Sequence, residues 1–314
     1  MREYAYATAP AKIILFGEHA VVYGRPAIAV PVTRLTAAVE ITTEPELSPG
    51  TVQIEAPDID LKSNLADLPS DYPLNVAIQA FTAHCGIKQI PPCVIKISSS
   101  IPVASGMGSG AAVSVALFRS LAAYFDMPLS KQELSELTFE VEKIHHGIPS
   151  GIDNTVIAFG MPVYFVKGQP PQTFEVSKPM NIIIGDTGIA SSTAVTVGGV
   201  RNAWLADKAA LDAVFDAIGE ITRSARCAIA EGQIQTLGNL MNENHALLRK
   251  LDVSSPELDN LVDAARQSGA LGAKLSGGGR GGNMIALTEN DRIEQVSQAL
   301  REAGARNIIT TIVK

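Results

Sequence analysis

A glycine-rich segment in the first half of the chain has the composition of an anion-binding loop. It leads into an apolar stretch that we expect to be helical over residues 110–124. Glycines let backbone amides approach a ligand closely, and the first amides of a helix are unpaired and lie at its positive dipole end. Such a loop suits a triphosphate, although a plain tight turn into a core helix is the alternative. The candidate residues are Ala104, Ser105, Gly106, Met107, Gly108, Ser109 and Gly110.

Two well-known phosphate-binding motifs do not describe this segment. A Walker loop is excluded because no Gly-Lys-Ser/Thr follows. Gly106, Gly108 and Ala111 do match the dinucleotide fingerprint G-x-G-x-x-A. That fingerprint needs an acidic residue at the end of the next strand, whereas Asp126 comes just after the helix and another helix follows. The dinucleotide interpretation therefore fails on its context.

A second glycine-rich loop lies about 170 residues further along the chain. Residues 276–282 contain five glycines, among them Gly277, Gly278 and Gly279, between two expected strands. A hairpin turn needs only one or two glycines, so we interpret the loop as backbone that presses against a ligand, with a mobile surface loop as the alternative. Two such loops suggest one from each domain, facing a shared cleft.

Two carboxylates lie close together in the segment EKIHHGIPSGIDN. Glu142 is on an expected helix, and Asp153 follows eleven residues later, beyond a Pro-Ser-Gly turn. A chain reversal there could bring both to one site, where one would hold Mg²⁺ and the other would act near a substrate hydroxyl. A solvated Glu and an ordinary turn Asp form the alternative. Zinc is disfavoured because His145 and His146, adjacent on a helix, point about 100° apart.

The N-terminal segment PAKIILFGEHAVVYG adds further candidates. Lys12 begins an apolar strand that does not itself need a charge, and Glu18 and His19 follow a glycine turn. A lysine at a strand edge usually faces solvent, which is the alternative for Lys12.

The elements that must position these residues are strands with helices inserted, which favours an α+β fold over a doubly wound sheet. We expect strands at residues 5–9, 12–16, 35–42, 51–55, 93–99, 156–159, 162–166, 181–185 and 307–313, and on both sides of the second glycine loop. We expect helices at 73–85, 110–124, 130–145 and 291–303, and a mainly helical block up to about residue 267. A loose stretch at 167–179 suggests two domains, residues 1–172 and 173–314.

Composition excludes several classes of protein. The 314 residues are 46% hydrophobic and 18% charged, as in a folded globular protein, and the net charge of −7 argues against a nucleic-acid partner. Cys85, Cys93 and Cys227 form neither a disulfide framework nor a zinc signature. We find no signal peptide and no apolar segment of membrane-spanning length, and we expect a cytoplasmic protein.

In this order, the four segments resemble the GHMP small-molecule kinases, from Pro10 to Leu287. The resemblance implies a two-domain α+β fold with the active site in the cleft between the domains, ATP and Mg²⁺ as cofactors, and a homodimer. It implies that Asp153 is the catalytic aspartate, that Lys12 contacts it and the substrate hydroxyl, and that Glu142 and Ser109 hold Mg²⁺. Glu18, His19 and Thr193 would lie beside the acceptor. Ser99, residues 104–110 and Gly277–Gly279 would bind the nucleotide.

The wording of GEHAVVYG and HGIPSGIDN is most similar to the members that phosphorylate mevalonate, the acceptor we therefore expect. Kinases for phosphomevalonate, homoserine or sugars, a related decarboxylase and a non-catalytic metabolite sensor are the alternatives. Three positions depart from the family pattern. Gly110 replaces a second serine that commonly helps to hold Mg²⁺, so Ser109 or water would substitute. Arg280 replaces a glycine and could reach a phosphate or point to solvent. Ser-Thr-Ala replaces Asn-Thr-Arg around Thr193.

Overall fold

The computed structural model describes residues 1–102, 105–146, 149–190 and 193–314, without the side chains of residues 145 and 146. Contacts divide the chain into two compact units. Unit 1 comprises Met1–Ala11, Leu35–Val103 and Gly108–Gly160, and unit 2 comprises Lys12–Arg34, Ala104–Met107 and Met161–Lys314. The chain therefore passes between the units within two long strands and within the first glycine loop. The proposed domain boundary between residues 172 and 173 stays a prediction.

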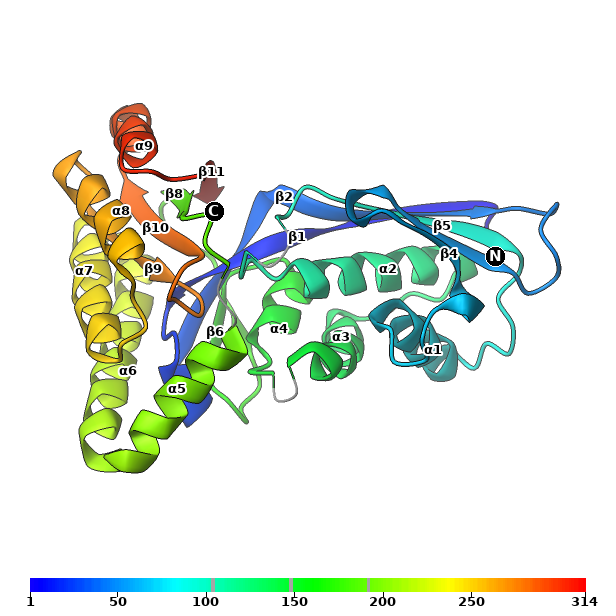
Figure 1. Ribbon diagram of the computed structural model, residues 1–314, viewed down its shortest axis with the longest axis horizontal. Helices are drawn as coiled ribbons and strands as arrows, with labels where there is room; N and C mark the ends of the chain where they lie inside the picture. Colours follow the sequence, from blue (N-terminus) through cyan, green and yellow to red (C-terminus); the bar gives the residue numbers. More distant parts are fainter. Residues whose placement is uncertain (103–104, 147–148, 191–192) are drawn as a thin grey trace. The chain divides into compact units, whose positions relative to one another are not determined.

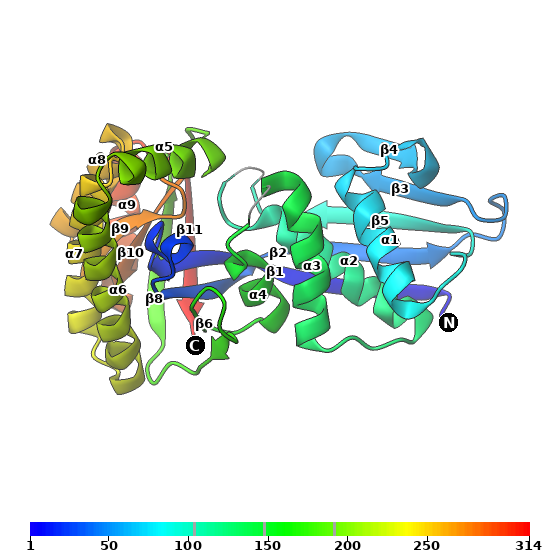
Figure 2. The same cartoon turned by 90° about the horizontal axis from the view of Figure 1, so that it is seen from below.

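Unit 1 is a mixed sheet with helices on one face (Figure 1). Its strands run in the order β4-β3-β5-β2, with β1 also paired to β2; β2 and β5 are antiparallel and β3 and β5 parallel. The strands are β1 (Tyr4–Phe16), β2 (Ala27–Thr43), β3 (Val52–Ala56), β4 (Leu61–Asn64) and β5 (Cys93–Ser99), of which β1 and β2 continue into unit 2. The helices are α1 (Pro73–Cys85), α2 (Ser109–Phe125), α3 (Lys131–His146) and α4 (Ile152–Phe159), with short 3₁₀ turns at Pro57–Ile59 and Leu65–Asp67. Seen from below, α1, α2 and α3 lie side by side (Figure 2).

Local sequence signals set several of these boundaries. The bounds of α1 and β5 match those expected. The N-terminus of α3 is a capping box, in which the amide of Ser130 donates to Glu133 Oε2 at 2.7 Å and the amide of Glu133 donates to Ser130 Oγ at 3.2 Å.

Two expectations about unit 1 were wrong. Residues 156–159 belong to helix α4 and are not a strand. Val156, Ile157 and Ala158 are all buried, and a short, wholly buried apolar run does not show by its periodicity which structure it adopts. The two strands expected at residues 5–9 and 12–16 are one continuous strand, β1, which runs through Pro10. In the described pairings β1 joins only β2, and proline is tolerated on such an edge strand.

Unit 2 contains an antiparallel sheet with strand order β11-β8-β10-β9. These strands are β8 (Met180–Asp186), β9 (Gly272–Ser276), β10 (Asn283–Thr288) and β11 (Asn307–Val313). The helices are α5 (Thr193–Ala206), α6 (Lys208–Glu231), α7 (Ile234–Lys250), α8 (Pro256–Gln267) and α9 (Ile293–Glu302), with 3₁₀ turns at Ala20–Tyr23 and Asn290–Arg292. The short strand β6 (Val163–Phe165) pairs with the start of β2 and with β7 (Gln172–Thr173).

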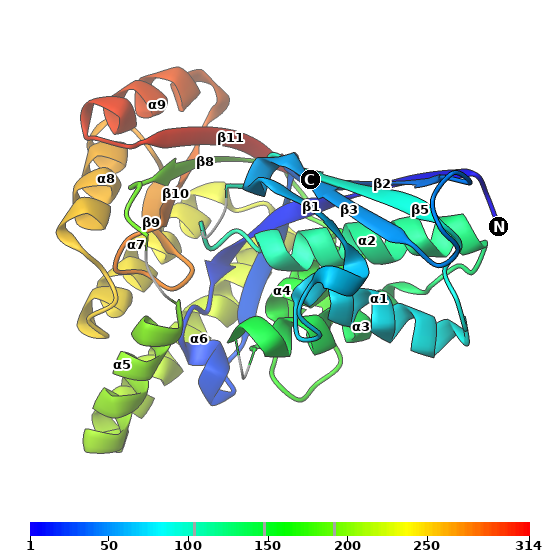
Figure 3. The same cartoon turned by 45° about the vertical axis from the view of Figure 1, so that its right-hand side comes forward.

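The core of unit 2 lies between this sheet and its helices (Figure 3). Phe215, Leu248, Leu258, Leu275 and Met284 are among its fully buried members. The two sheets with inserted helices confirm the α+β class. None of the described helices is long and apolar enough to span a bilayer.

Candidate active site

In unit 1, the N-terminus of α2 forms the second half of the first glycine loop. Gly108 precedes the helix with φ +73°, a left-handed conformation that glycine adopts without steric cost. The chain then turns into the helix at Ser109, so the first amides of α2 lie at its positive end. Ala111, Ala112 and Val115 bury the helix in the unit. This half of the loop has the properties expected of an anion site.

Glu142 lies beside this helix terminus. Its side chain is 4% exposed, and a Cβ built on Gly110 would lie 3.4 Å from Glu142 Oε1. Gly110 has no positive φ, so its backbone does not require glycine, and its missing side chain leaves room next to the carboxylate. Among the described side chains, no three His, Cys, Asp or Glu residues cluster as a metal site. One carboxylate beside the N-terminus of a helix that suits an anion nonetheless fits Mg²⁺, which is usually held by one or two carboxylates together with substrate phosphates and water.

Asp153 lies in the first turn of α4. Gly151, with φ +87°, starts this helix, and Asn154 fixes it by donating from Nδ2 to Ser135 O at 3.0 Å and to Ser135 Oγ at 2.9 Å. Asp153 is half-buried. The N-terminus of a helix favours a carboxylate, and the helix holds Asp153 in a fixed place.

Ser99 ends β5, and its hydroxyl accepts a hydrogen bond from the amide of Ile101 at 3.1 Å. The candidate Ala104 lies outside the described residues.

In unit 2, Lys12 contacts the first half of the glycine loop. Its Nζ donates to Gly106 O at 2.9 Å, and its amide donates to Met107 O at 3.0 Å. The side chain is 3% exposed, so the alternative of a solvent-facing lysine is wrong. The ammonium group of Lys12 therefore lies against the backbone carbonyl of Gly106.

The two glycine loops meet within unit 2. Asn283 follows the second loop, and its Nδ2 donates to Ser105 O at 2.5 Å. A Cβ built on Gly277 would lie 3.9 Å from Gly106 O, and one on Gly282 would lie 3.9 Å from Ser105 O. Gly279, with φ +79°, is packed so closely that a Cβ would come within 1.9 Å of Val253 O. These contacts do not support the alternative of a mobile surface loop.

Glu18 and His19 form a buried turn against the same loop. Lys274 donates to Glu18 Oε1, and both side chains are fully buried. Burial raises the pKa of Glu18 and lowers that of Lys274, while their mutual attraction opposes both shifts. His19, with φ +61°, donates from Nε2 to Gly278 O at 3.0 Å. Burial lowers the pKa of His19 to about 4, so its imidazole is neutral near pH 7.

Thr193 completes this group as the first residue of α5. It is exposed, and a Cβ built on Gly278 would lie 3.1 Å from its Oγ1. His19 and Thr193 therefore both lie next to Gly278.

Arg280 is exposed, which agrees with one of the two possibilities given for it, a side chain that points to solvent. Its guanidinium Nη2 lies 2.8 Å from Asp252 Oδ2, in an ion pair within unit 2.

Sequence reasoning missed three residues that hold these pieces together. They are Lys274, Asn283 and Ser276. The Ser276 hydroxyl accepts from the amide of Ile14 at 3.2 Å and donates to the carbonyl of Ile14 at 2.9 Å. One signal was available, because a lysine inside the apolar strand AKLS needs a buried partner.

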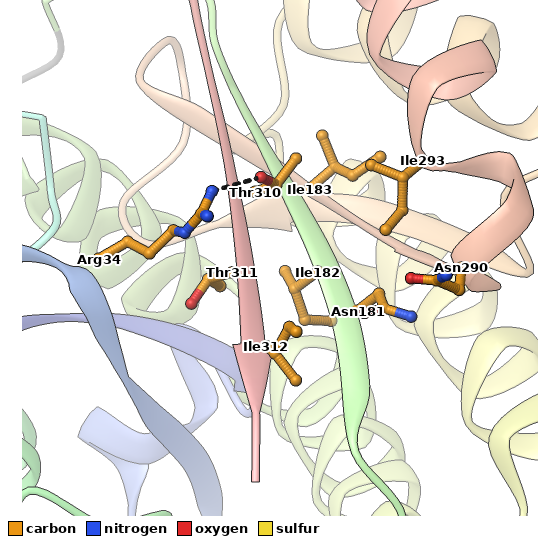
Figure 4. A pocket seen from close by; sticks show the side chains of 9 residues that line it. All are labelled: Arg34, Asn181, Ile182, Ile183, Asn290, Ile293, Thr310, Thr311 and Ile312. Carbon is orange, nitrogen blue, oxygen red and sulfur yellow. Dashed lines mark hydrogen bonds between the residues drawn. The ribbon is translucent and has the colours of Figure 1, made fainter.

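A separate pocket of about 200 Å³ lies on β8 and β11 (Figure 4). Arg34 reaches across it to Thr310 Oγ1 at 3.2 Å. None of the candidate residues lines this pocket.

Comparisons with known proteins agree with this arrangement. Residues 72–161 match the GHMP kinases N terminal domain and residues 225–306 match the GHMP kinases C terminal domain. The mevalonate kinase of Pyrococcus horikoshii is 35% identical over 99% of this chain and 96% of its own length. That of Saccharolobus solfataricus is 31% identical over 98% and 96%.

A solved structure extends the agreement to three dimensions. The L. major mevalonate kinase in complex with R-mevalonate is 30% identical, covers 98% of this chain and 95% of its own, and superposes with a TM-score of 0.86. The chain therefore belongs to the GHMP kinase family and, within it, to the group of the mevalonate kinases.

Proposed function

We propose that this protein transfers the terminal phosphate of ATP to the 5-hydroxyl of mevalonate, giving 5-phosphomevalonate and ADP. One observation carries the proposal beyond family membership. Within unit 2, the second glycine loop and Asn283 next to it contact both the first glycine loop, at Ser105, and the turn that carries His19. A single hairpin thus holds residues assigned to the nucleotide and residues assigned to the acceptor.

On the nucleotide side, the amides of Gly106, Gly108 and Ser109 are proposed to bind the triphosphate. Ser99 and Gly277–Gly279 are proposed to complete this binding surface. Glu142 and Ser109 are proposed to hold Mg²⁺, which when bound neutralises charge on the β- and γ-phosphates. The room beside Gly110 would accept a water in place of the family's second serine hydroxyl.

On the acceptor side, most of the catalysis is positioning and charge stabilisation. Lys12 is proposed to stabilise negative charge that develops on the attacking oxygen, since it is buried and electrostatic effects are stronger away from water. Asp153 is proposed to orient the hydroxyl and accept its proton late in the reaction, because a carboxylate is a weak base.

His19 and Thr193 are proposed to contact the acceptor directly. Neutral His19 donates from Nε2 to Gly278 O. Its Nδ1 is therefore an acceptor and suits a substrate hydroxyl. Glu18 stays on this side of the site, with its carboxylate against Lys274. A cytoplasmic location and a homodimer remain predictions.

Product analysis tests the proposal. We expect ³¹P NMR of a reaction with ATP, Mg²⁺ and R-mevalonate to show a new phosphomonoester signal as ADP forms. The Asp153→Asn variant should slow its appearance roughly 10²-fold with little change in ATP affinity. Release of CO₂, or ADP formation without a phosphorylated acceptor, would contradict the proposal.

A further inference from the structure

Arg280 occupies a strained backbone position in the second glycine loop. Its φ is +56°, and that of its partner Asp252 is +57°, although neither is a glycine. The Arg280 amide donates to Val253 O at 2.7 Å, its Nε donates to Asp252 O at 3.0 Å, and its Nη2 pairs with Asp252 Oδ2 at 2.8 Å. Glycine would adopt this backbone more easily, as it does on both sides at Gly279 and Gly281. An arginine at this position therefore indicates that the side chain has a role, which its contacts identify.

Those contacts include helix α5. A Cβ built on Gly199 would lie 3.6 Å from both terminal guanidinium nitrogens of Arg280, so the arginine packs where α5 has no side chain. Thr193, at the start of the same helix, lies beside Gly278. The N-terminal part of α5 thus meets the second glycine loop at two points.

Other contacts also hold α5 in the unit. Of its described residues, only Thr196 and Val200 are buried. Its C-terminal part is fixed by Trp204, which packs against Tyr23 at 5.2 Å between ring centroids and whose Nε1 donates to Asp212 Oδ1 at 3.3 Å. Arg280 and Trp204 thus contact α5 at different points along its length.

We propose that Arg280 is a positioning residue for the acceptor, because it holds α5 against the second glycine loop so that Thr193 stays beside Gly278 and His19. The inference rests on the proposed function. It assigns the Arg280 side chain to acceptor affinity, whereas ATP affinity stays with the nucleotide-side residues proposed above. Arg280 also lies close enough to His19 to act on it. The pKa of His19 is lowered to about 4, mainly by burial and also by the positive charge of Arg280.

The variant Arg280→Gly separates a positioning role from a structural one. Glycine relieves the backbone strain, and an exposed ion pair contributes little to stability, so we expect Tm to stay unchanged or rise. The KM for mevalonate should nevertheless rise roughly tenfold, with the KM for ATP changed by less than about twofold. Arg280→Lys should recover part of the affinity. Arg301→Ala is the matched control, because it removes another exposed, ion-paired arginine of unit 2, on α9, and should change neither KM.

Three results would overturn the proposal. An unchanged KM for mevalonate in Arg280→Gly would show that the arginine does not act on the acceptor side. A fall in Tm together with equal rises in the KM for mevalonate and the KM for ATP would show a purely structural role. If the variant raises the KM for mevalonate but not the KM for its uncharged methyl ester, Arg280 contacts the carboxylate directly. Failure of the proposed function is distinguishable, because the wild-type protein would then not turn over mevalonate.

Discussion

At the scale of single residues, burial determines the protonation state of the second unit's histidines. His19 donates to Gly278 O, and His245 on α7 lies between Asp259 Oδ1, 3.2 Å from its Nε2, and the amide of Leu275, 3.3 Å from its Nδ1. Burial lowers the pKa of each to about 4, and the nearby cation Arg266 lowers that of His245 further. Both imidazoles are therefore neutral where the enzyme is expected to work.

These histidines predict acid-sensitive stability. Their unfolded pKa is near 6.5, so between pH 6.5 and about 4 the unfolded chain binds protons that the folded chain does not. The free energy of unfolding should fall as the pH falls through this range, by up to about 3 kcal/mol for each histidine. Urea unfolding of wild type and His245→Gln at pH 7.5, 6 and 5 measures this. The variant should lose less stability on acidification, and equal losses would show that His245 is not kept neutral by the fold.

At the scale of elements, the β9–β10 hairpin organises the candidate residues of unit 2. Lys274 and Ser276 on β9 hold the N-terminal segment at Glu18 and Ile14. Asn283 on β10 holds the first glycine loop at Ser105. The glycines between them allow a close backbone approach that side chains would block. The hairpin thus orders residues more than 170 positions apart in the chain.

This arrangement predicts an effect on ATP that is separate from the acceptor. Asn283→Ala removes the 2.5 Å hydrogen bond to Ser105 O and frees the loop that is proposed to bind the triphosphate. We expect the KM for ATP to rise about tenfold, with the KM for mevalonate little changed, which is the reverse of Arg280→Gly. Steady-state kinetics with each substrate varied in turn measures both. Equal changes in the two KM values would show that Asn283 supports the unit as a whole.

Local patterns predicted most elements of this fold, because caps, turns and alternation act within a few residues. The capping box at Ser130 and Glu133 and the alternation of β5 are examples. The buried run of α4 had no distinguishing period, so it was assigned to a strand. The charged candidate residues can be named from the sequence and stay predictions, whereas the partners of Glu18 and Ser105 cannot be named from it. Those partners are Lys274 and Asn283, which the fold brings close from distant parts of the chain.

At the scale of the whole molecule, the family places the chain among kinases for small hydroxylated molecules, and its relatives over nearly the full length are mevalonate kinases. The net charge of −7 agrees with a small-molecule substrate and argues against a nucleic-acid partner. The remaining question is acceptor choice, which we propose depends on few residues around His19 and Thr193. We propose that this choice is mevalonate.

Acceptor selectivity tests that claim most directly. ADP release is measured by a coupled assay with ATP, Mg²⁺ and, side by side, mevalonate, phosphomevalonate, homoserine and galactose. We predict that kcat/KM for mevalonate exceeds that for each other acceptor by at least about 10³-fold, since a site that hydrogen-bonds its substrate leaves polar groups unpaired with the wrong one. A higher kcat/KM for any of the other three acceptors, or ADP release that does not depend on an acceptor, would contradict the account.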